Sequence, residues 1–352
     1  MSIIYNGTIE STVKENHYHI TWHNPEKNST DSFTQSAGIM PDEVQRLWHQ
    51  PLYQLTIGQK LFRFLDGEAH HFQQALDHAW QQGESLQIYL HACKETADWP
   101  FELLARDNEF LLPNRRLHLV RCVSDWGKVK NIPPKNRPLK FLFMACSAID
   151  VQPELDFERE GETIFHITEK LPIDMEVEDS GSLEGLRRRL EQEHFDVVHL
   201  SGHADIDESG SPFFVMEDET GHEQKVFPGE LWNEALIENP PRLLFLSGCR
   251  TGERVGASGA SDTTGSVSAV SFARVLVVNY HVPAVLGWGR SVVEEQANHA
   301  TRILFRDLSR GKSILESIQR ARYELLKGFL LDPILLGRFC VYSAMAHPWM
   351  LL

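Results

Sequence analysis

The chain has 352 residues, 42% of them hydrophobic and 24% charged, which suits one large or two ordinary globular domains and excludes a disordered or fibrous chain. The formal net charge of −15 disfavours direct contact with nucleic acid, because phosphate binding requires clustered Lys and Arg. The longest apolar runs are too short to cross a bilayer, and the opening MSIIYNGTIE lacks the basic and apolar segments of a signal peptide.

The cysteines are odd in number, widely spaced and without a CxxC pair, which argues against a disulfide framework or a zinc ribbon. We therefore expect a cytoplasmic protein whose thiols stay reduced. The five positions are Cys93, Cys122, Cys146, Cys249 and Cys340.

The first part of the chain has strand-like and helix-like patterns. Strands are predicted at residues 3–9, 17–22, 86–90 and 117–122, with a polar loop over 24–37. Helical periodicity begins after Pro51 and is interrupted at Gly67, and a short helix is predicted over 98–104 with Asp98 as its N-cap. The proline- and lysine-rich segment 130–138 predicts a boundary, which divides the chain into residues 1–137 and 138–352.

Beyond that boundary, apolar strands alternate with helices. Strands are predicted at 139–146, 195–200, 243–246 and 284–288, a hairpin at 212–226, and helices at 157–171, 183–192, 291–310 and 312–327. This alternation predicts an α/β fold with a mostly parallel sheet and helices on both faces. The arginines at 187–189 lie in a helical pattern and are interpreted as a solvated face.

Two apolar strands each end in a small-residue turn that carries a reactive side chain. The first reads VVHLSGHA and carries His203, and the second reads LLFLSGCRTG and carries Cys249. Carboxyl ends of parallel strands meet at one edge of a sheet, so both turns should reach one crevice. An imidazole beside a thiol increases its thiolate fraction and later protonates a leaving amine. The two residues are 46 positions apart, close to the roughly 50 between the His and Cys of a caspase.

These segments resemble the CHAT domain, the caspase-like peptidase domain related to caspases and separases. HLSGHA is similar to that family's His motif, and LSGCRTGE is similar to its Cys motif; VPAVLGWGRSV, the region around Gly311 and, more loosely, WPFELL also match. The resemblance extends from about residue 55 to residue 342. It implies a caspase-like peptidase domain preceded by an α/β pseudo-peptidase-like lobe.

The resemblance implies a cysteine endopeptidase with Cys249 as nucleophile and His203 as general base, and with no cofactor. The oxyanion would be held by the amide of Cys249 and one near Ala204, while Gly202 and Gly248 allow close backbone approach. The family usually has Gly after the His, so Ala204 is a departure that bears on the oxyanion geometry. His199 lies inside its strand and is expected to support the site or pack in the core.

The segments at 148–158 and 288–290 correspond to the substrate pocket of caspase-like enzymes. The first is acidic, and Asp150 and Asp156 would favour a basic P1 residue, with Arg290 as a further pocket residue. The alternative interpretation makes Asp156 a helix N-cap. Residues 251–268 are rich in Gly, Ser, Ala and Thr, and we interpret them either as a control loop or as a solvated one.

The expected partners are a protein substrate and a regulatory protein or fused module, with no nucleic acid bound directly and no membrane. The resemblance implies a regulated protease of bacterial defence or signalling. One alternative is a catalytically silent caspase-like scaffold or binding module that signals through assembly. Another is a zinc hydrolase that uses His199, His203 and Cys249, for which no fourth ligand is evident in the sequence.

Overall fold

A computed structural model describes residues 2–40, 43–44, 47, 50–93, 95–97, 99–112, 117–122, 138–152, 156–169, 172–209, 211–248, 268–288, 294–328 and 339–343. The chain divides into two compact units. Unit 1 contains residues 1–124 and 322–337, and unit 2 contains residues 125–321 and 338–352. The boundary expected at residue 137 falls outside the described residues and stays a prediction.

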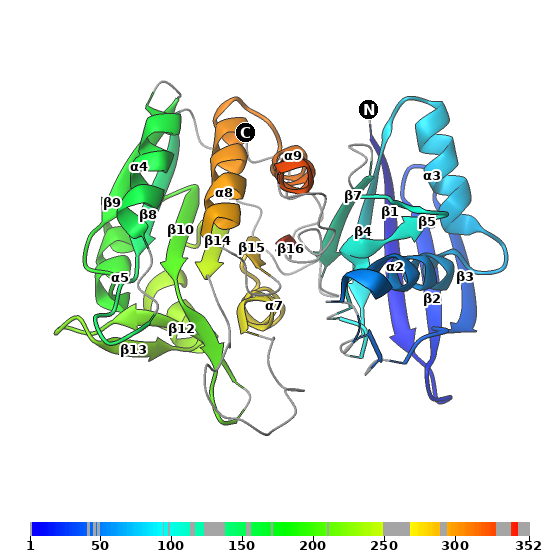
Figure 1. The fold of residues 1–352 in the computed structure, drawn as a ribbon, viewed down its shortest axis with the longest axis horizontal. Coiled ribbons are helices and arrows are strands. Elements are labelled where there is room, and N and C mark those ends of the chain that lie inside the picture. The colour runs from blue at the N-terminus through cyan, green and yellow to red at the C-terminus, as the bar shows by residue number, and fades with distance from the viewer. Residues whose placement is uncertain are drawn as a thin grey trace. The chain divides into compact units, whose positions relative to one another are not determined.

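The longer described strands of unit 1 form one mixed sheet (Figure 1). The sheet order is β3-β2-β1-β4-β7, in which β1 is antiparallel to β2 and parallel to β4. Its larger elements are β1 (Ser2–Ser11), β2 (His17–Asn24), β3 (Ser29–Ser36), α2 (Pro51–Asp66), α3 (His71–Gln81), β4 (Ser85–Ala92) and β7 (Leu117–Cys122). Its short elements are η1 (Phe101–Leu103), β5 (Ala105–Arg106) and β6 (Glu109–Phe110).

The helices of unit 1 begin and end where the sequence indicates. Pro51 starts α2, and Gly67 follows its last residue at φ 66°, a left-handed conformation that favours glycine. The helices pack on the sheet through Trp22, whose indole donates to the carbonyl of Leu65 at 2.9 Å and stacks on Phe72 at 5.6 Å. This contact secures α2 and α3 to one core.

Two predictions in unit 1 were wrong. Residues 24–37 contain the strand β3, which pairs antiparallel with β2 along its full length. Apart from Phe33 its side chains are polar, and most of them are exposed, so the apolar alternation of a half-buried strand is absent. The helix expected over 98–104 is only the 3-10 turn η1, and Asp98 lies outside the described residues.

Unit 2 is a mostly parallel α/β sheet. The order is β16-β15-β14-β10-β8-β9, and among these described strands only β16 is antiparallel to its neighbour. Its sheet strands are β8 (Leu139–Ala145), β9 (Ile173–Glu178), β10 (Val197–Gly202), β14 (Leu243–Gly248), β15 (Ala284–Trp288) and β16 (Phe339–Ser343). A small antiparallel sheet contains β11 (Ala204–Ile206), β12 (Pro212–Glu217) and β13 (Glu223–Val226).

Helices cover both faces of this sheet, which confirms the predicted fold class (Figure 1). On one face α8 places Phe305 against Phe141 of β8, at 4.5 Å between ring centroids, and α4 lies beside it. On the other face α5 pairs Arg189 with Glu176 of β9, and α7 packs on β15. The helices of unit 2 are α4 (Phe157–Thr168), α5 (Leu183–Gln192), α6 (Pro228–Glu230), η2 (Leu231–Leu236), α7 (Ser268–Tyr280) and α8 (Glu294–Ser309). The last helix, α9 (Ile314–Gly328), begins in unit 2 and ends in unit 1.

The arginine run at 187–189 was predicted as a solvated helix face; it lies on α5, where Arg188 is exposed and Arg187 and Arg189 are partly buried in ion pairs. Arg187 pairs with Glu184 and Glu191 on its own helix. The loop expected at 251–268 lies outside the described residues except for its last position, Ser268, which begins α7.

Candidate active site

The strands that carry the two reactive motifs are neighbours in the sheet. β10 and β14 run parallel, both are buried along their whole length, and their last residues, Gly202 and Gly248, are register partners. His203 and Cys249 are the next residues along the chain. Neighbouring strands lie about 4.8 Å apart, so the two strands end side by side. Cys249 itself lies outside the described residues.

His203 lies at a junction between the main sheet and the small sheet. It is half-buried, its carbonyl accepts a hydrogen bond from the Val215 amide at 2.8 Å, and Ala204 immediately begins β11, paired with Phe214. The backbone on both sides of His203 is therefore held by strand pairing. This rigid attachment suits a residue that must keep a fixed orientation.

The two glycines at the strand ends are packed against protein atoms. A Cβ on Gly202 would lie 3.1 Å from Cβ of Cys146 and 3.1 Å from the ring of Phe214. A Cβ on Gly248 would lie 3.2 Å from Cβ of Ala204. The methyl of Ala204, where the family usually has glycine, thus fits because residue 248 has no side chain.

A buried cluster of three polar side chains, Ser201, Glu160 and His199, lies between β10 and α4. The Ser201 hydroxyl donates to Oε2 of Glu160 at 2.5 Å, and Oε1 of Glu160 lies 3.6 Å from Nε2 of His199. His199 is fully buried and stacks on Phe245 with ring centroids 4.5 Å apart. Burial lowers the pKa of His199 to about 3, so the ring is neutral at physiological pH. The prediction that His199 packs in the core is confirmed.

Cys146 follows β8 and lies beside Gly202 at the end of β10, and the sequence did not single it out. Its amide donates to the Ser201 carbonyl at 2.8 Å, which extends the pairing of β8 and β10. Burial raises the pKa of its thiol well above the ordinary value, and the charges of Glu217 and Glu178 raise it further. A thiol that stays protonated is a poor nucleophile, so Cys146 is a packing residue.

Glu217 is a second residue that the sequence did not reveal. Its Oε1 accepts from the Ser147 amide at 2.8 Å, and its own amide donates to the Gly181 carbonyl at 3.0 Å. Gly181 has φ 61°, and any Cβ there would collide with the Glu217 carboxylate. Glu217 therefore joins the end of β8 to the turn between β9 and α5.

The acidic residues of the expected substrate pocket hydrogen-bond to backbone. Asp150 is exposed and accepts from the Glu223 amide at 2.8 Å, on the first residue of β13. Asp156 is exposed and is the N-cap of α4, accepting from the Arg159 amide at 3.1 Å. Arg290 lies outside the described residues. The N-cap interpretation of Asp156 is thus confirmed, while the role of all three residues in specificity stays a prediction.

Metal and membrane features were searched over the part of the chain that the structure describes. There, no group of three or more His, Cys, Asp and Glu side chains is arranged to hold a metal ion. No described helix has the length and apolar character needed to span a membrane.

The model of the CHAT domain family matches residues 50–342, well over half of the chain. The separase–securin complex of Saccharomyces cerevisiae contains a chain that is 9% identical with a TM-score of 0.50, covering 97% of this chain and 30% of that one. The Arg-specific cysteine proteinase gingipain R is 9% identical with a TM-score of 0.47, covering 83% of this chain and 73% of that one. A search of curated protein sequences finds no match. The likeness to separase shows a shared fold, and this chain spans less than a third of the separase chain.

Proposed function

The chain belongs to the CHAT domain family, and we propose that it is a cysteine endopeptidase in which Cys249 is the nucleophile and His203 the general base. The observation that carries the proposal is the register of Gly202 with Gly248 at the ends of β10 and β14. Because the next residues are His203 and Cys249, an imidazole and a thiol leave adjacent strand ends at one edge of the sheet.

In the proposed reaction, His203 takes the proton of the Cys249 thiol as the sulfur attacks the scissile carbonyl carbon. The amide of Cys249 and one near Ala204 hold the oxyanion of the tetrahedral intermediate. His203 then gives its proton to the leaving amine, and the C–N bond breaks to leave a thioester. Water attacks the thioester with His203 again as base, which releases the acid and restores the thiol.

Specificity is proposed to involve Asp150, Asp156 and Arg290, with a basic P1 residue favoured by the two carboxylates. Both carboxylates are exposed and lie on segments that follow β8, next to β10 in the sheet. Their hydrogen bonds to backbone amides leave further lone pairs for a substrate cation.

The cellular role is proposed to be regulated cleavage of a protein substrate in the cytoplasm, in bacterial defence or signalling. The net charge of −15 and the absence of a CxxC pair support a reducing compartment and a protein rather than a nucleic acid as target. Control is proposed to come from residues 251–268 together with a regulatory protein or a fused module.

The test is labelling by a series of peptidyl electrophiles that differ at P1, read by intact mass and peptide mapping. We expect modification of Cys249 alone, its loss in the His203→Ala variant, and unchanged labelling in the matched Cys146→Ser and Cys93→Ser variants. A Cys249 that reacts no faster than Cys340, in the presence and absence of a protein substrate, would refute the peptidase and favour a silent scaffold.

A further inference from the structure

The edge strand β9 of unit 2 presents one side to which no described strand is paired. It is last in the sheet order and pairs only with β8 among the described residues. A parallel strand of this kind directs alternate amides and carbonyls away from the sheet, where they can pair with a further strand. Within the described part of the chain, this side of β9 can therefore accept a further strand.

Side chains of β9 alternate between two different environments. On the α5 side, Asp174 lies 3.7 Å from Lys140 and Glu176 pairs with Arg189, so the acidic groups are matched by bases. On the α4 side, Met175 and Val177 are apolar and line a pocket. The two faces thus differ in character, and the α4 face is the apolar one.

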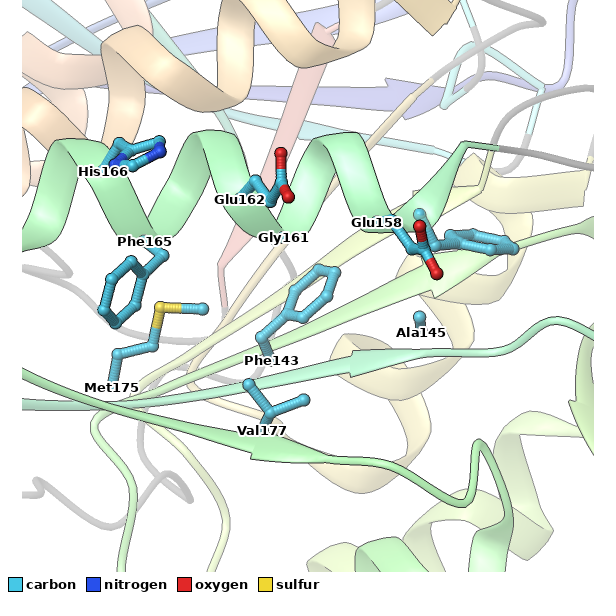
Figure 2. Close-up of a pocket in the computed structure, with 10 residues that line it drawn as sticks. Phe143, Ala145, Glu158, Gly161, Glu162, Phe165, His166, Met175 and Val177 are labelled. Carbon is cyan, nitrogen blue, oxygen red and sulfur yellow. The ribbon is translucent and has the colours of Figure 1, made fainter.

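The pocket between α4 and the strands β8 and β9 is an apolar groove of about 530 Å³. Figure 2 shows Phe165 and Met175 together at one end, with Phe143 and Val177 between the helix and the strands. Phe165 is 56% exposed and Val177 is 49% exposed. Large apolar side chains gathered at a groove, rather than scattered singly, mark a binding surface.

Negative charge lies along the helical rim of this groove. Glu158 and Glu162 of α4 line it, and neither forms an ion pair with any residue in the described part of the chain. Glu158 lies at the end near Ala145, away from Phe165, as Figure 2 shows. An occupant should therefore have apolar side chains toward Phe165 and a basic one toward Glu158.

A second copy of this chain fits the groove poorly. Its β9 reads IDMEVE, so it would offer carboxylates and no basic side chain to Glu158 and Glu162. The whole chain also has a net charge of −15, which opposes self-association and favours a basic partner.

We propose that β9 and the groove beside α4 bind an extended segment of a partner protein, which adds a strand to the sheet. Alternate apolar side chains of that segment enter the groove, and a Lys or Arg lies against Glu158 and Glu162. The groove is lined by residues of α4, β8 and β9 and by none of β10 or β14, whose ends are at Gly202 and Gly248. It recruits the partner protein that carries this segment, and it does not depend on catalysis.

The test uses fluorescent peptides of the sequence Thr-Val-Thr-Val-Thr-Arg-Thr and its reverse, because the strand direction is open. Binding is followed by fluorescence anisotropy with the full chain. We expect saturable binding that weakens at least tenfold when Arg is replaced by Glu, or when the central Val is replaced by Pro, which removes an amide donor. Hydrogen exchange of residues 173–178 should slow in the complex.

Variants of the protein complete the test. Phe165→Ser and the double variant Glu158→Gln, Glu162→Gln should each weaken binding at least fivefold. The matched control Ile237→Ser, at a residue 51% exposed on another surface, should bind as the parent does. A Cys249→Ala variant should also bind normally, which separates this proposal from the peptidase. Equal binding by Phe165→Ser and Ile237→Ser, or no change in the hydrogen exchange of β9, would overturn the proposal. The absence of any peptide binding would overturn it as well.

Discussion

Replacement of the buried Glu102 by glutamine is expected to destabilise unit 1 severely. Glu102 is fully buried, and its carboxylate accepts from Nε of Arg121 at 2.9 Å and from Nη2 at 2.5 Å. Arg121 also donates to the carbonyls of Ala97 and Trp99. Nη2 of the buried Arg322 lies 3.9 Å from Oε1. One carboxylate thus faces two buried guanidinium groups.

The magnitude follows from what Glu102→Gln leaves behind. An amide has the same size, but it carries no charge, and its NH2 group would point at guanidinium donors. Removing one partner of a buried pair costs about 3–5 kcal/mol, since the other charge stays buried and uncompensated. Urea unfolding at pH 7 measures this loss. The matched control is Glu184→Gln at the exposed pair with Arg187, which should leave stability unchanged within error.

The pH dependence gives a second, independent check. Burial alone would raise the pKa of Glu102, but the charges and hydrogen bonds of Arg121, together with Arg322, outweigh it and hold the pKa below its ordinary value. The stabilisation is therefore complete above the unfolded-state value, about 4.3, and is lost as the pH falls through the folded pKa. The difference between parent and Glu102→Gln should shrink below about pH 4.3. A difference no larger than that of Glu184→Gln, or one that persists unchanged well below pH 4, would refute the reasoning.

Three further predictions concern unit 2. His199→Phe keeps the stack on Phe245. Because burial lowers the pKa of His199 to about 3, the unfolded parent chain takes up a proton below about pH 6.5 that the folded chain does not. The free energy of unfolding of the variant should therefore fall less between pH 6.5 and 4 than that of the parent. Gly202→Ala should lower the free energy of unfolding in urea by about 1–3 kcal/mol, because its Cβ would lie 3.1 Å from Cys146 and Phe214. Gly161→Ala in α4, with no contact closer than 3.4 Å, should raise it by up to about 1 kcal/mol, and equal effects of the two variants would contradict the packing argument. Asp156→Asn should preserve the cap of α4 and its stability while Asp156→Ala loses about 0.5–2 kcal/mol, and a fall in selectivity for basic P1 peptides in the Asn variant would place the carboxylate in the substrate pocket.

Local elements of this protein could be predicted where their own residues specify them. The helix over 183–192 was predicted with its observed bounds, because Ser182 caps it and Leu183, Leu186 and Leu190 form one buried face. The buried strands β10 and β14 were recognisable as continuous apolar runs. The small-residue turns after these strands indicated that His203 and Cys249 directly follow the strand ends, although Cys249 lies outside the described residues.

Elements at the edges of the sheets were missed because their pattern is weak by itself. β3 is a polar strand whose only described partner is β2, and β9 was not predicted because half of its residues are acidic. Both segments are strands because their backbones pair with a neighbouring strand, and such pairing leaves little periodicity in the side chains. The groove beside β9 was therefore invisible before the fold was known.

The sequence by itself determined the fold class, the order of the two reactive motifs and the family, since these depend on local periodicity and on short runs of residues. Only the tertiary structure decided that β8 lies between β9 and β10, and this order brings Cys146 under Gly202 and Glu160 of α4 onto Ser201 and His199. Glu160 and Ser201 are 41 residues apart, and no local pattern encodes a contact at that separation. Such contacts arise when apolar faces are buried together and the chain packs in a single register, which is a property of the whole sheet and not of any one segment.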